Sequence, residues 1–408
     1  MNAHLLQSRR FILTLGLLTA TAALTVDLSL PAIPSMVVAL ESTLTHGQQI
    51  VGIFMAGMAV GQIPAGLFSD RLGRLPTLYV GMTLFAIAAT VAASSTEMGW
   101  LLLARFVQGI GAASAVVLSR AIVRDISSGK EAARLMSLMT MIFTAAPVIA
   151  PTFGALLVAQ WGWRAPFIAI ALCGYLMLLG IRKNLVETHR PEVSEHPVRQ
   201  LVSSFGEFFS HRQSIFGLLL LLLPPAGFLS IIAVSAALTV KIYGYSVEAY
   251  GLIFACAGLS ILAGSAVNRL LVARFDQLQL IALAIGLIFA ASAQLVVIAW
   301  LDSAPFWWLW LCVCLFMFTI AILMSNTMVV ALDPLPKIAG VASSIIGTLQ
   351  NLSGACGALL AALIYDGSVR NSVIIMATVG LITTALFLMR PLIAPGPFVH
   401  HPEELARD

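Results

Sequence analysis

Two charged residues lie in stretches of the chain that are otherwise apolar. Arg105 is embedded in the run 100–118, and Asp27 lies in the first apolar segment. A guanidinium keeps its proton in proteins, and placing it near the centre of a bilayer costs at least about 2.5 kcal/mol on insertion scales. A chain that keeps such a charge must supply a counter-charge, a water-filled cavity, or both. Asp27 is the one carboxylate placed similarly, so the pair marks a candidate functional site, with or without direct contact.

The composition explains why these two residues stand out. The chain has 408 residues, of which 60% are hydrophobic and 10% are charged, whereas soluble domains carry about 25% charged residues. Its mean hydropathy is +0.98. Backbone groups in lipid must bond internally, so apolar stretches of about 20 residues predict membrane-spanning helices. The pattern predicts an all-α membrane protein with twelve spans, at 11–33, 49–68, 76–94, 100–119, 135–158, 165–182, 214–238, 249–270, 279–300, 306–331, 339–364 and 371–393.

The distribution of Lys and Arg predicts the orientation. With a cytoplasmic N-terminus, Arg164, Lys241 and Arg370 fall outside and Arg105 falls in the membrane, while the remaining 18 of the 22 Lys and Arg residues face the cytoplasm. Both termini are therefore expected to be cytoplasmic. The net charge of +4 fits contact with anionic lipid rather than nucleic acid. The first apolar run is too long for a signal-peptide core, so it is interpreted as a span.

A polar stretch divides the spans six and six. We predict an N-terminal six-helix bundle at 1–186, a cytoplasmic linker at 187–212, a C-terminal six-helix bundle at 213–394 and a cytoplasmic tail at 395–408. A weak internal repeat supports two parallel halves, because a basic turn follows both the second and the eighth spans.

The turn after the second span is the most specific motif. It runs Gly66-Leu-Phe-Ser-Asp-Arg-Leu-Gly-Arg74. Its first glycine would allow close helix approach, its second glycine permits the turn, and its arginines can reach Asp125 or lipid phosphates. Its aspartate can pair with a basic side chain or with the N-terminus of the helix that begins near Gly340. We interpret it as a latch between the halves; the alternative is that its arginines only set topology. The latch residues are Gly66, Asp70, Arg71, Gly73, Arg74, Asp125 and Gly340.

Two further motifs lie within spans. Gln108 follows Arg105 by three residues and so shares its helix face. The fifth span contains Pro147, Pro151 and Gly154, which permit bending and close packing. They indicate either a helix that moves between two states or ordinary helix packing.

These motifs together resemble those of the major facilitator superfamily. The turn after the second span resembles its Gly-x-x-x-Asp-Arg-x-Gly-Arg signature, and the segment around Arg105 resembles the fourth helix of its drug/proton antiporters. The fifth span resembles the antiporter signature, with alanine at two glycine positions. The segments 25–34, 161–164 and 325–344 resemble the Bcr/CflA group, which includes bicyclomycin and chloramphenicol/florfenicol resistance proteins. The resemblance covers nearly the whole chain, but Ser29 stands where the group commonly has tyrosine, so a drug contact at that position is in doubt.

The resemblance implies a fold and an activity. The fold would be two six-helix bundles around a central cavity, and the activity would be proton-driven efflux of small amphipathic drugs across the bacterial inner membrane. The implied partners are drug, proton and lipid; the expected state is a monomer, and no cofactor is expected beyond the proton gradient.

The implied mechanism uses the two intramembrane charges. Loss of water favours a protonated carboxylate, whereas a nearby arginine favours the charged form. We expect Asp27, near the outer end of its span, to take a proton from outside and to release it inward as substrate binds. Arg105 would tune this cycle and contact substrate. One carboxylate makes one proton per cycle the simplest stoichiometry. The alternative for Asp27 is an acid at an interfacial helix end.

The substrate cavity should be mainly apolar with a few polar groups. Methionine and phenylalanine adapt to ligands of varied shape, although each candidate could instead pack in the core or face lipid. The candidates by position are Phe54, Met55, Met58, Gln62, Gln108, Phe143, Phe228, Phe254, Asn326 and Gln350.

Other functions are less consistent with the sequence. A facilitator-fold exporter of a metabolite, such as a sugar or amino acid, is the nearest alternative, and the fifth-span motif favours an antiporter over it. A primary pump or enzyme is not expected, because the chain has no phosphate-binding loop and its seven histidines fall outside the predicted spans. The five cysteines lie within spans and are expected to be packing residues, with no metal site.

Overall fold

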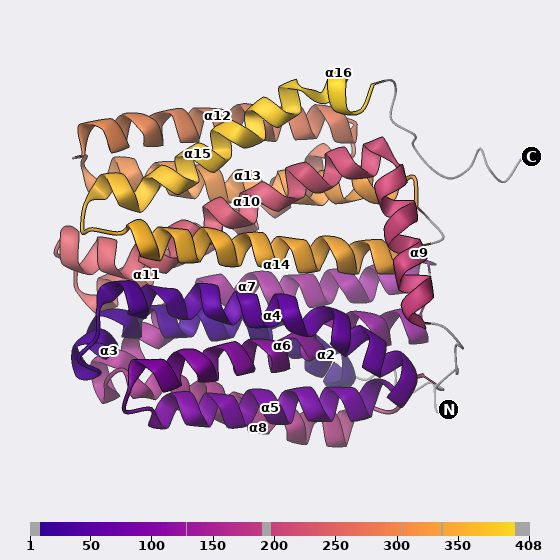
Figure 1. The fold of residues 1–408 in the computed structure, drawn as a ribbon, viewed down its shortest axis with the longest axis horizontal. Coiled ribbons are helices and arrows are strands. Elements are labelled where there is room, and N and C mark those ends of the chain that lie inside the picture. Colours follow the sequence, from indigo (N-terminus) through magenta and orange to yellow (C-terminus); the bar gives the residue numbers. More distant parts are fainter. Residues whose placement is uncertain (1–8, 128, 190–196, 303, 336–337, 396–408) are drawn as a thin grey trace, which may run out of the picture. The chain divides into compact units, whose positions relative to one another are not determined.

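The protein is helical throughout the part that the structure describes. A computed structural model describes residues 9–127, 129–189, 197–302, 304–335 and 338–395 (Figure 1). No β-strand occurs among these residues, which confirms the all-α prediction. The elements are α2 (Arg9–Ser29), η1 (Leu30–Ala32), α3 (Ile33–Ala39), α4 (Leu44–Leu72), α5 (Arg74–Ser94), α6 (Met98–Ile126), α7 (Gly129–Trp161), α8 (Arg164–Asn184), α9 (Pro197–Ser210), α10 (Arg212–Ala237), η2 (Leu238–Ile242), α11 (Val247–Leu271), α12 (Gln277–Leu301), α13 (Phe306–Leu332), α14 (Ala339–Ile364), α15 (Val369–Leu388) and α16 (Arg390–Ile393).

Twelve helical segments of the described chain are long and apolar enough to cross a membrane. This number matches the sequence prediction. The first segment is longer than predicted, because α2, η1 and α3 continue it over Arg10–Ala39. Pro31 and Pro34 occupy first-turn positions in η1 and α3, where a missing N–H costs no helical hydrogen bond. Asp27 therefore lies inside this segment, with seventeen residues before it and twelve after it.

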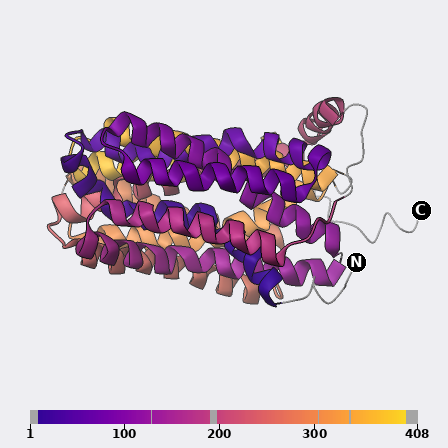
Figure 2. The same ribbon diagram turned by 90° about the horizontal axis from the view of Figure 1, so that it is seen from below.

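The chain forms two compact units. The first comprises Met1–Ser194 with Ile232–Gly258, and the second comprises Glu195–Ile231 with Leu259–Asp408. Within the first unit α6 packs against α2, α4 and α5, while α5 also packs against α8 (Figures 1 and 2). Within the second unit α12 packs against α13 and α15. α6 is thus the central helix of the first unit, and it carries Arg105.

The segment Ile232–Gly258 belongs to the first unit, although the predicted halves assign it to the C-terminal one. The reason is a close crossing between α7 and α11. Gly258 lies against the backbone of Pro147, where an added Cβ would approach the Pro147 carbonyl carbon to 2.7 Å. The Thr152 hydroxyl donates a hydrogen bond of 3.1 Å to the Gly251 carbonyl. α7 therefore holds this part of α11 directly.

The predicted linker contains a helix that the sequence analysis did not anticipate. α9 places Phe208 in an apolar cluster with Leu221, Leu335 and Ile345 of the second unit. Residues 190–196 of the linker, and the predicted tail from residue 396 onward, lie outside the described residues.

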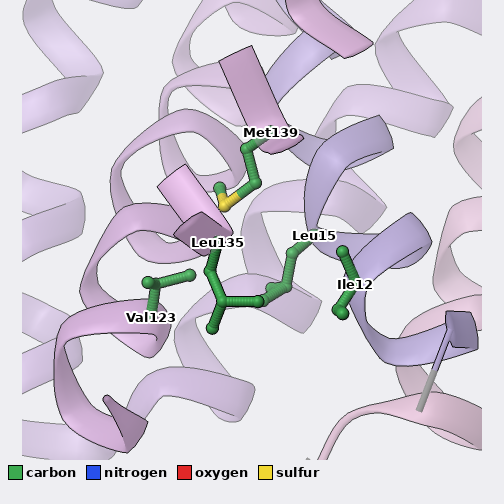
Figure 3. Close-up of a pocket in the computed structure, with 5 residues that line it drawn as sticks. All are labelled: Ile12, Leu15, Val123, Leu135 and Met139. Atoms are coloured by element: carbon green, nitrogen blue, oxygen red, sulfur yellow. The ribbon is translucent and has the colours of Figure 1, made fainter. Parts of the chain in front are cut away.

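A small apolar void separates α2, α6 and α7 in the first unit (Figure 3). It has no room for a water molecule. With no polar group in its wall, it is a packing defect rather than a binding site. Its lining residues are Ile12, Leu15, Val123, Leu135 and Met139.

Candidate functional site

Arg105 is fully buried in the first unit, and neutral groups surround it. Its Nη1 donates a hydrogen bond of 2.8 Å to Gln108 Oε1, one helical turn along α6. Longer bonds of 3.5 Å run from Nε to the Ile50 carbonyl and from Nη2 to Ser29 Oγ. Three helical elements thus supply acceptors for the guanidinium, and none of these acceptors carries a charge.

An aromatic ring supplies a further contact. The Arg105 guanidinium carbon lies 4.6 Å from the centre of the Phe54 ring, within the range of cation–π attraction. This contact is possible because glycines, which have no side chain, let α4 and α6 touch backbone to backbone. A Cβ at Gly109 would come within 2.1 Å of the Phe54 carbonyl oxygen, and one at Gly57 within 2.1 Å of the Phe106 carbonyl oxygen. Larger residues at these glycines would force the guanidinium away from the ring.

Asp27 is buried without a partner. Its side chain is 4% exposed, and no hydrogen bond or ion pair holds it among the described residues. Asp27 and Arg105 therefore form no ion pair, although Ser29, two residues after Asp27, accepts a bond from Arg105. A guanidinium and a carboxyl group buried without direct contact are costly to keep when both are ionised. The arrangement suits groups that bind a proton or a ligand better than groups that stabilise the fold.

The predicted latch loop contains a charge cluster centred on Arg74. Its Nε and Nη2 donate to the two Asp125 oxygens at 2.8 and 3.2 Å, and its Nη1 donates to Ser69 Oγ at 2.8 Å and to the Asp70 carboxylate. Gly73, which precedes Arg74, has a φ of +100°, a conformation that favours glycine. The turn thus directs the Arg74 side chain back between the ends of α4 and α6.

The remaining latch residues make fewer contacts. Arg71 is exposed and has no ion pair among the described residues. Nothing in the described chain lies within 4 Å of the place that a side chain at Gly66 would take, so no close approach is seen there. Gly340 lies in the first turn of α14, in the second unit. A latch between the halves therefore stays a prediction.

The segment after α8 docks onto this loop, which the sequence analysis missed. Glu187 accepts hydrogen bonds from the backbone N–H groups of Arg74 and Leu75, both at 2.9 Å. The Thr188 hydroxyl donates to Asp125 Oδ2 at 3.1 Å, and His189 Nε2 lies 3.2 Å from the Asp70 carbonyl. A signal was present in retrospect, because Glu187 is an acidic residue close to a basic turn on the same side of the predicted membrane.

The fifth-span motif lies in α7 and makes close contacts on two sides. A Cβ at Gly154 would come within 2.3 Å of the Leu28 carbonyl oxygen, next to Asp27. Pro147 lies against Gly258 of α11. Pro151 lies inside the same helix, within the 33 residues of α7. The motif thus joins the Asp27 region of α2 to α11.

The predicted cavity residues fall in both units. In the first unit Gln108 and Phe54 contact Arg105, whereas Phe143 is 37% exposed. In the second unit the Asn326 amide donates to Asn268 Oδ1 at 2.7 Å, and Gln350 donates to the Leu221 carbonyl at 3.4 Å. The structure therefore groups Phe54 and Gln108 at Arg105. The others buried in the first unit are Met55, Met58, Gln62 and Phe254, and Phe228 is half-buried in the second.

No group of three or more His, Cys, Asp or Glu residues in the described part of the chain is placed to hold a metal ion. The five cysteines are free thiols. Tyr250 and Ser235, which the sequence analysis did not single out, form a buried hydrogen-bonded pair in the first unit.

Comparison with known proteins identifies the family. The family model of the Major Facilitator Superfamily matches residues 15–358. The chain belongs to this superfamily. It is 30% identical over 359 residues to a bicyclomycin resistance protein homolog of Haemophilus influenzae, covering 87% of this chain and 90% of that protein. It is 26% identical over 377 residues to multidrug resistance protein D of Escherichia coli, covering 92% and 94%. These relatives confirm the resemblance to the Bcr/CflA group.

Solved structures show the same fold. A D-xylose–proton symporter matches with a TM-score of 0.74 at 18% identity, over 92% of this chain and 97% of that one. A POT family transporter in complex with 5-aminolevulinic acid matches with a TM-score of 0.75 at 16% identity, over 94% and 96%. The chain is thus a multi-pass transporter of the major facilitator fold, and its relatives are transporters rather than enzymes.

Proposed function

We propose that this transporter exports small amphipathic drugs in exchange for protons, by alternating access. The substrates would be of the chloramphenicol, florfenicol or bicyclomycin class, and the membrane would be the bacterial inner membrane with both termini in the cytoplasm. The names of the relatives support drug efflux, since they include bicyclomycin resistance and multidrug resistance proteins.

One observation supports the coupling to protons most strongly. Asp27 lies inside an apolar helix, is almost fully buried, and has no hydrogen bond or ion pair among the described residues. A carboxylate in such surroundings changes its protonation readily as water enters or leaves. Asp27 takes a proton from the outside, and substrate binding from the inside displaces it.

Arg105 has a complementary role. Its fixed charge lies on α6 beside Ser29, so it acts on the same region as Asp27 without neutralising it. Its planar donor groups also suit carbonyl, hydroxyl or nitro acceptors of a neutral drug. The transporter works as a monomer with drug, proton and lipid as its partners, and it needs no cofactor other than the proton gradient.

A susceptibility panel tests the substrate class. The chain is expressed in an efflux-deficient bacterial host and challenged with chloramphenicol, florfenicol, bicyclomycin and unrelated amphipathic drugs. The proposal predicts resistance to at least one drug, and loss of that resistance in Asp27→Asn at equal expression. No resistance to any amphipathic drug, together with export of a sugar or amino acid, would replace it with a metabolite exporter.

A further inference from the structure

A second polar cluster lies buried in the first unit, on the segment that α10 and α11 contribute. Tyr250 and Ser235 are both fully buried, and Tyr250 Oη lies 2.9 Å from Ser235 Oγ. The Thr239 hydroxyl, four residues after Ser235, is buried without a partner in the described structure. A polar group buried without a hydrogen bond is costly to keep.

The direction of the hydrogen bonds can be worked out. Ser235 Oγ donates its single hydrogen to the Ile232 carbonyl at 2.8 Å. Ser235 therefore accepts in the pair with Tyr250, and Tyr250 is the donor. The Tyr250 oxygen then has only lone pairs left, so on its remaining side it can act only as an acceptor.

Tyr250 and Asp27 lie in the same region. The Leu28 carbonyl packs against Gly154 of α7, and Thr152, two residues earlier in α7, bonds to the Gly251 carbonyl. The chain neighbours of Asp27 and Tyr250 are thus joined through one stretch of α7. The two side chains interact electrostatically, without a direct hydrogen bond.

No other titratable side chain holds Asp27. The elements packed against α2 are α6, α7 and α8, and the described side chains of α7 include no titratable group. None of the titratable groups on α6, α8 or the segment 232–258 forms an ion pair or hydrogen bond with Asp27 among the described residues. They are Arg105, Arg120, Arg124, Asp125, Arg164, Cys173, Tyr175, Arg182, Lys183, Lys241, Tyr243, Tyr245, Glu248, Tyr250 and Cys256.

We propose that Tyr250 and Ser235 form a hydroxyl chain that holds Asp27 in its protonated state. In that state the Asp27 carboxyl donates to Tyr250 Oη, directly after a rotamer change or through one water. Tyr250 donates to Ser235, and Ser235 donates to the Ile232 carbonyl. When the proton leaves, Ser235 still holds the Tyr250 hydrogen, so the Tyr250 oxygen presents only lone pairs to the carboxylate, and both hydroxyls keep their own protons. Tyr250 and Ser235 are positioning residues that set when Asp27 releases its proton.

The inference rests on the proposed role of Asp27, and it predicts a direction of change. Tyr250→Phe removes the acceptor for the protonated carboxyl. Ser235→Ala frees the Tyr250 hydrogen to bond with the carboxylate. Both changes weaken proton binding, by about one pH unit or tenfold in proton affinity. Ser235→Thr keeps the hydroxyl and should behave like the wild type.

Infrared difference spectroscopy on the purified protein tests this hydroxyl chain. The carbonyl band of the protonated carboxyl, assigned by its loss in Asp27→Asn, is titrated with pH in the absence of drug. The inferred hydroxyl chain predicts that the pH midpoint of this band is lowered by about one pH unit in Tyr250→Phe and in Ser235→Ala. It also predicts a band at higher wavenumber in Tyr250→Phe, because the carboxyl loses its acceptor. A packing role alone would not move this band.

Matched control variants distinguish an effect of the hydroxyl chain from general destabilisation of the protein. Tyr175→Phe removes a tyrosine hydroxyl that bonds Thr90, and Ser230→Ala removes a buried hydroxyl that bonds only within α10. Both should leave the band and its midpoint unchanged, as should Ser235→Thr. An unchanged band in Tyr250→Phe and Ser235→Ala, or the absence of an Asp27 band at any pH, would overturn the inference.

A parallel measurement of chloramphenicol-induced proton release keeps the two proposals apart. If the wild type releases no proton with any drug of the panel but the variants shift the band, the coupling proposal fails and the hydroxyl chain stands. If release occurs and the band does not shift in the variants, only the inferred hydroxyl chain is wrong.

Discussion

The carboxylate of Glu187 accepts a hydrogen bond from the backbone N–H of Arg74 at 2.9 Å, although the two residues are 113 positions apart. Its second oxygen accepts from Leu75. These N–H groups begin α5, where no helical partner exists and where the helix dipole favours a negative charge. Glu187 therefore serves as a cap supplied by a distant segment, and it ties the chain after α8 to the turn that Arg74 stabilises.

Replacing Glu187 with alanine should loosen the start of α5. Loss of a capping carboxylate costs about 1–2 kcal/mol, so amide hydrogens of Arg74 and Leu75 should exchange about five to thirty times faster. Hydrogen-exchange mass spectrometry measures this directly. Glu97→Ala is the matched control, because Glu97 precedes α6 without a side-chain cap. Equal exchange in both variants would contradict the capping role.

Arg71 and Arg74 should differ sharply despite their shared motif. Arg74 is buried and bonds Asp70, Ser69 and Asp125, whereas Arg71 is exposed without an ion pair among the described residues. Arg74→Lys loses the planar fork and should destabilise the protein by about 1–3 kcal/mol, while Arg71→Lys should stay within about 0.5 kcal/mol. Thermal unfolding in detergent compares them, and similar melting temperatures for the two variants would refute the distinction.

The sequence predicted much of this architecture because hydropathy is local. Twelve apolar segments, a buried arginine and a buried aspartate are visible in the order of residues alone. The different roles of Arg71 and Arg74 were not visible in the sequence. Two arginines three positions apart are equivalent there, and only the turn at Gly73 directs one of them inward. The partners of Arg105 come from Ile50 and Ser29 on other elements, and such contacts leave no periodic signal.

Some features gave a weak signal that was not used. Tyr250 stands in an apolar span, as Asp27 does, yet an isolated tyrosine is common enough to pass as packing. α9 was missed because its residues fall in a polar stretch between spans, where helical periodicity was not expected. The first span was predicted to end at residue 33, whereas η1 and α3 continue it to Ala39, with Pro31 and Pro34 in first-turn positions.

Two buried glutamines should respond in opposite ways to replacement by leucine. Gln108 is the nearest acceptor of Arg105, so Gln108→Leu leaves a buried charge under-bonded and should cost about 1–3 kcal/mol. Gln48 is 0% exposed and both its amide atoms lack partners in the described structure. Gln48→Leu should therefore be neutral or stabilising. The melting temperatures of the two variants in detergent test this difference. A larger loss of melting temperature in Gln48→Leu than in Gln108→Leu would contradict the role of Gln108 as the acceptor of Arg105.

The crossing of α7 and α11 should not tolerate a methyl group. An alanine Cβ at position 258 would approach the Pro147 carbonyl to 2.7 Å, so Gly258→Ala should cost about 1–3 kcal/mol and reduce transport. Gly286 is also helical, and nothing lies within 4 Å of its missing side chain. Gly286→Ala should be neutral or more stable by up to about 1 kcal/mol. Equal transport by both variants would show that α7 and α11 need not stay in this contact.

The central claim is that Asp27 exchanges a proton for substrate. The most direct test adds a drug from the resistance panel to purified, weakly buffered protein in detergent and measures the protons released. The account predicts release of about one proton per bound drug by the wild type, and none by Asp27→Asn that still binds the drug. Release of the same number of protons by Asp27→Asn would contradict it.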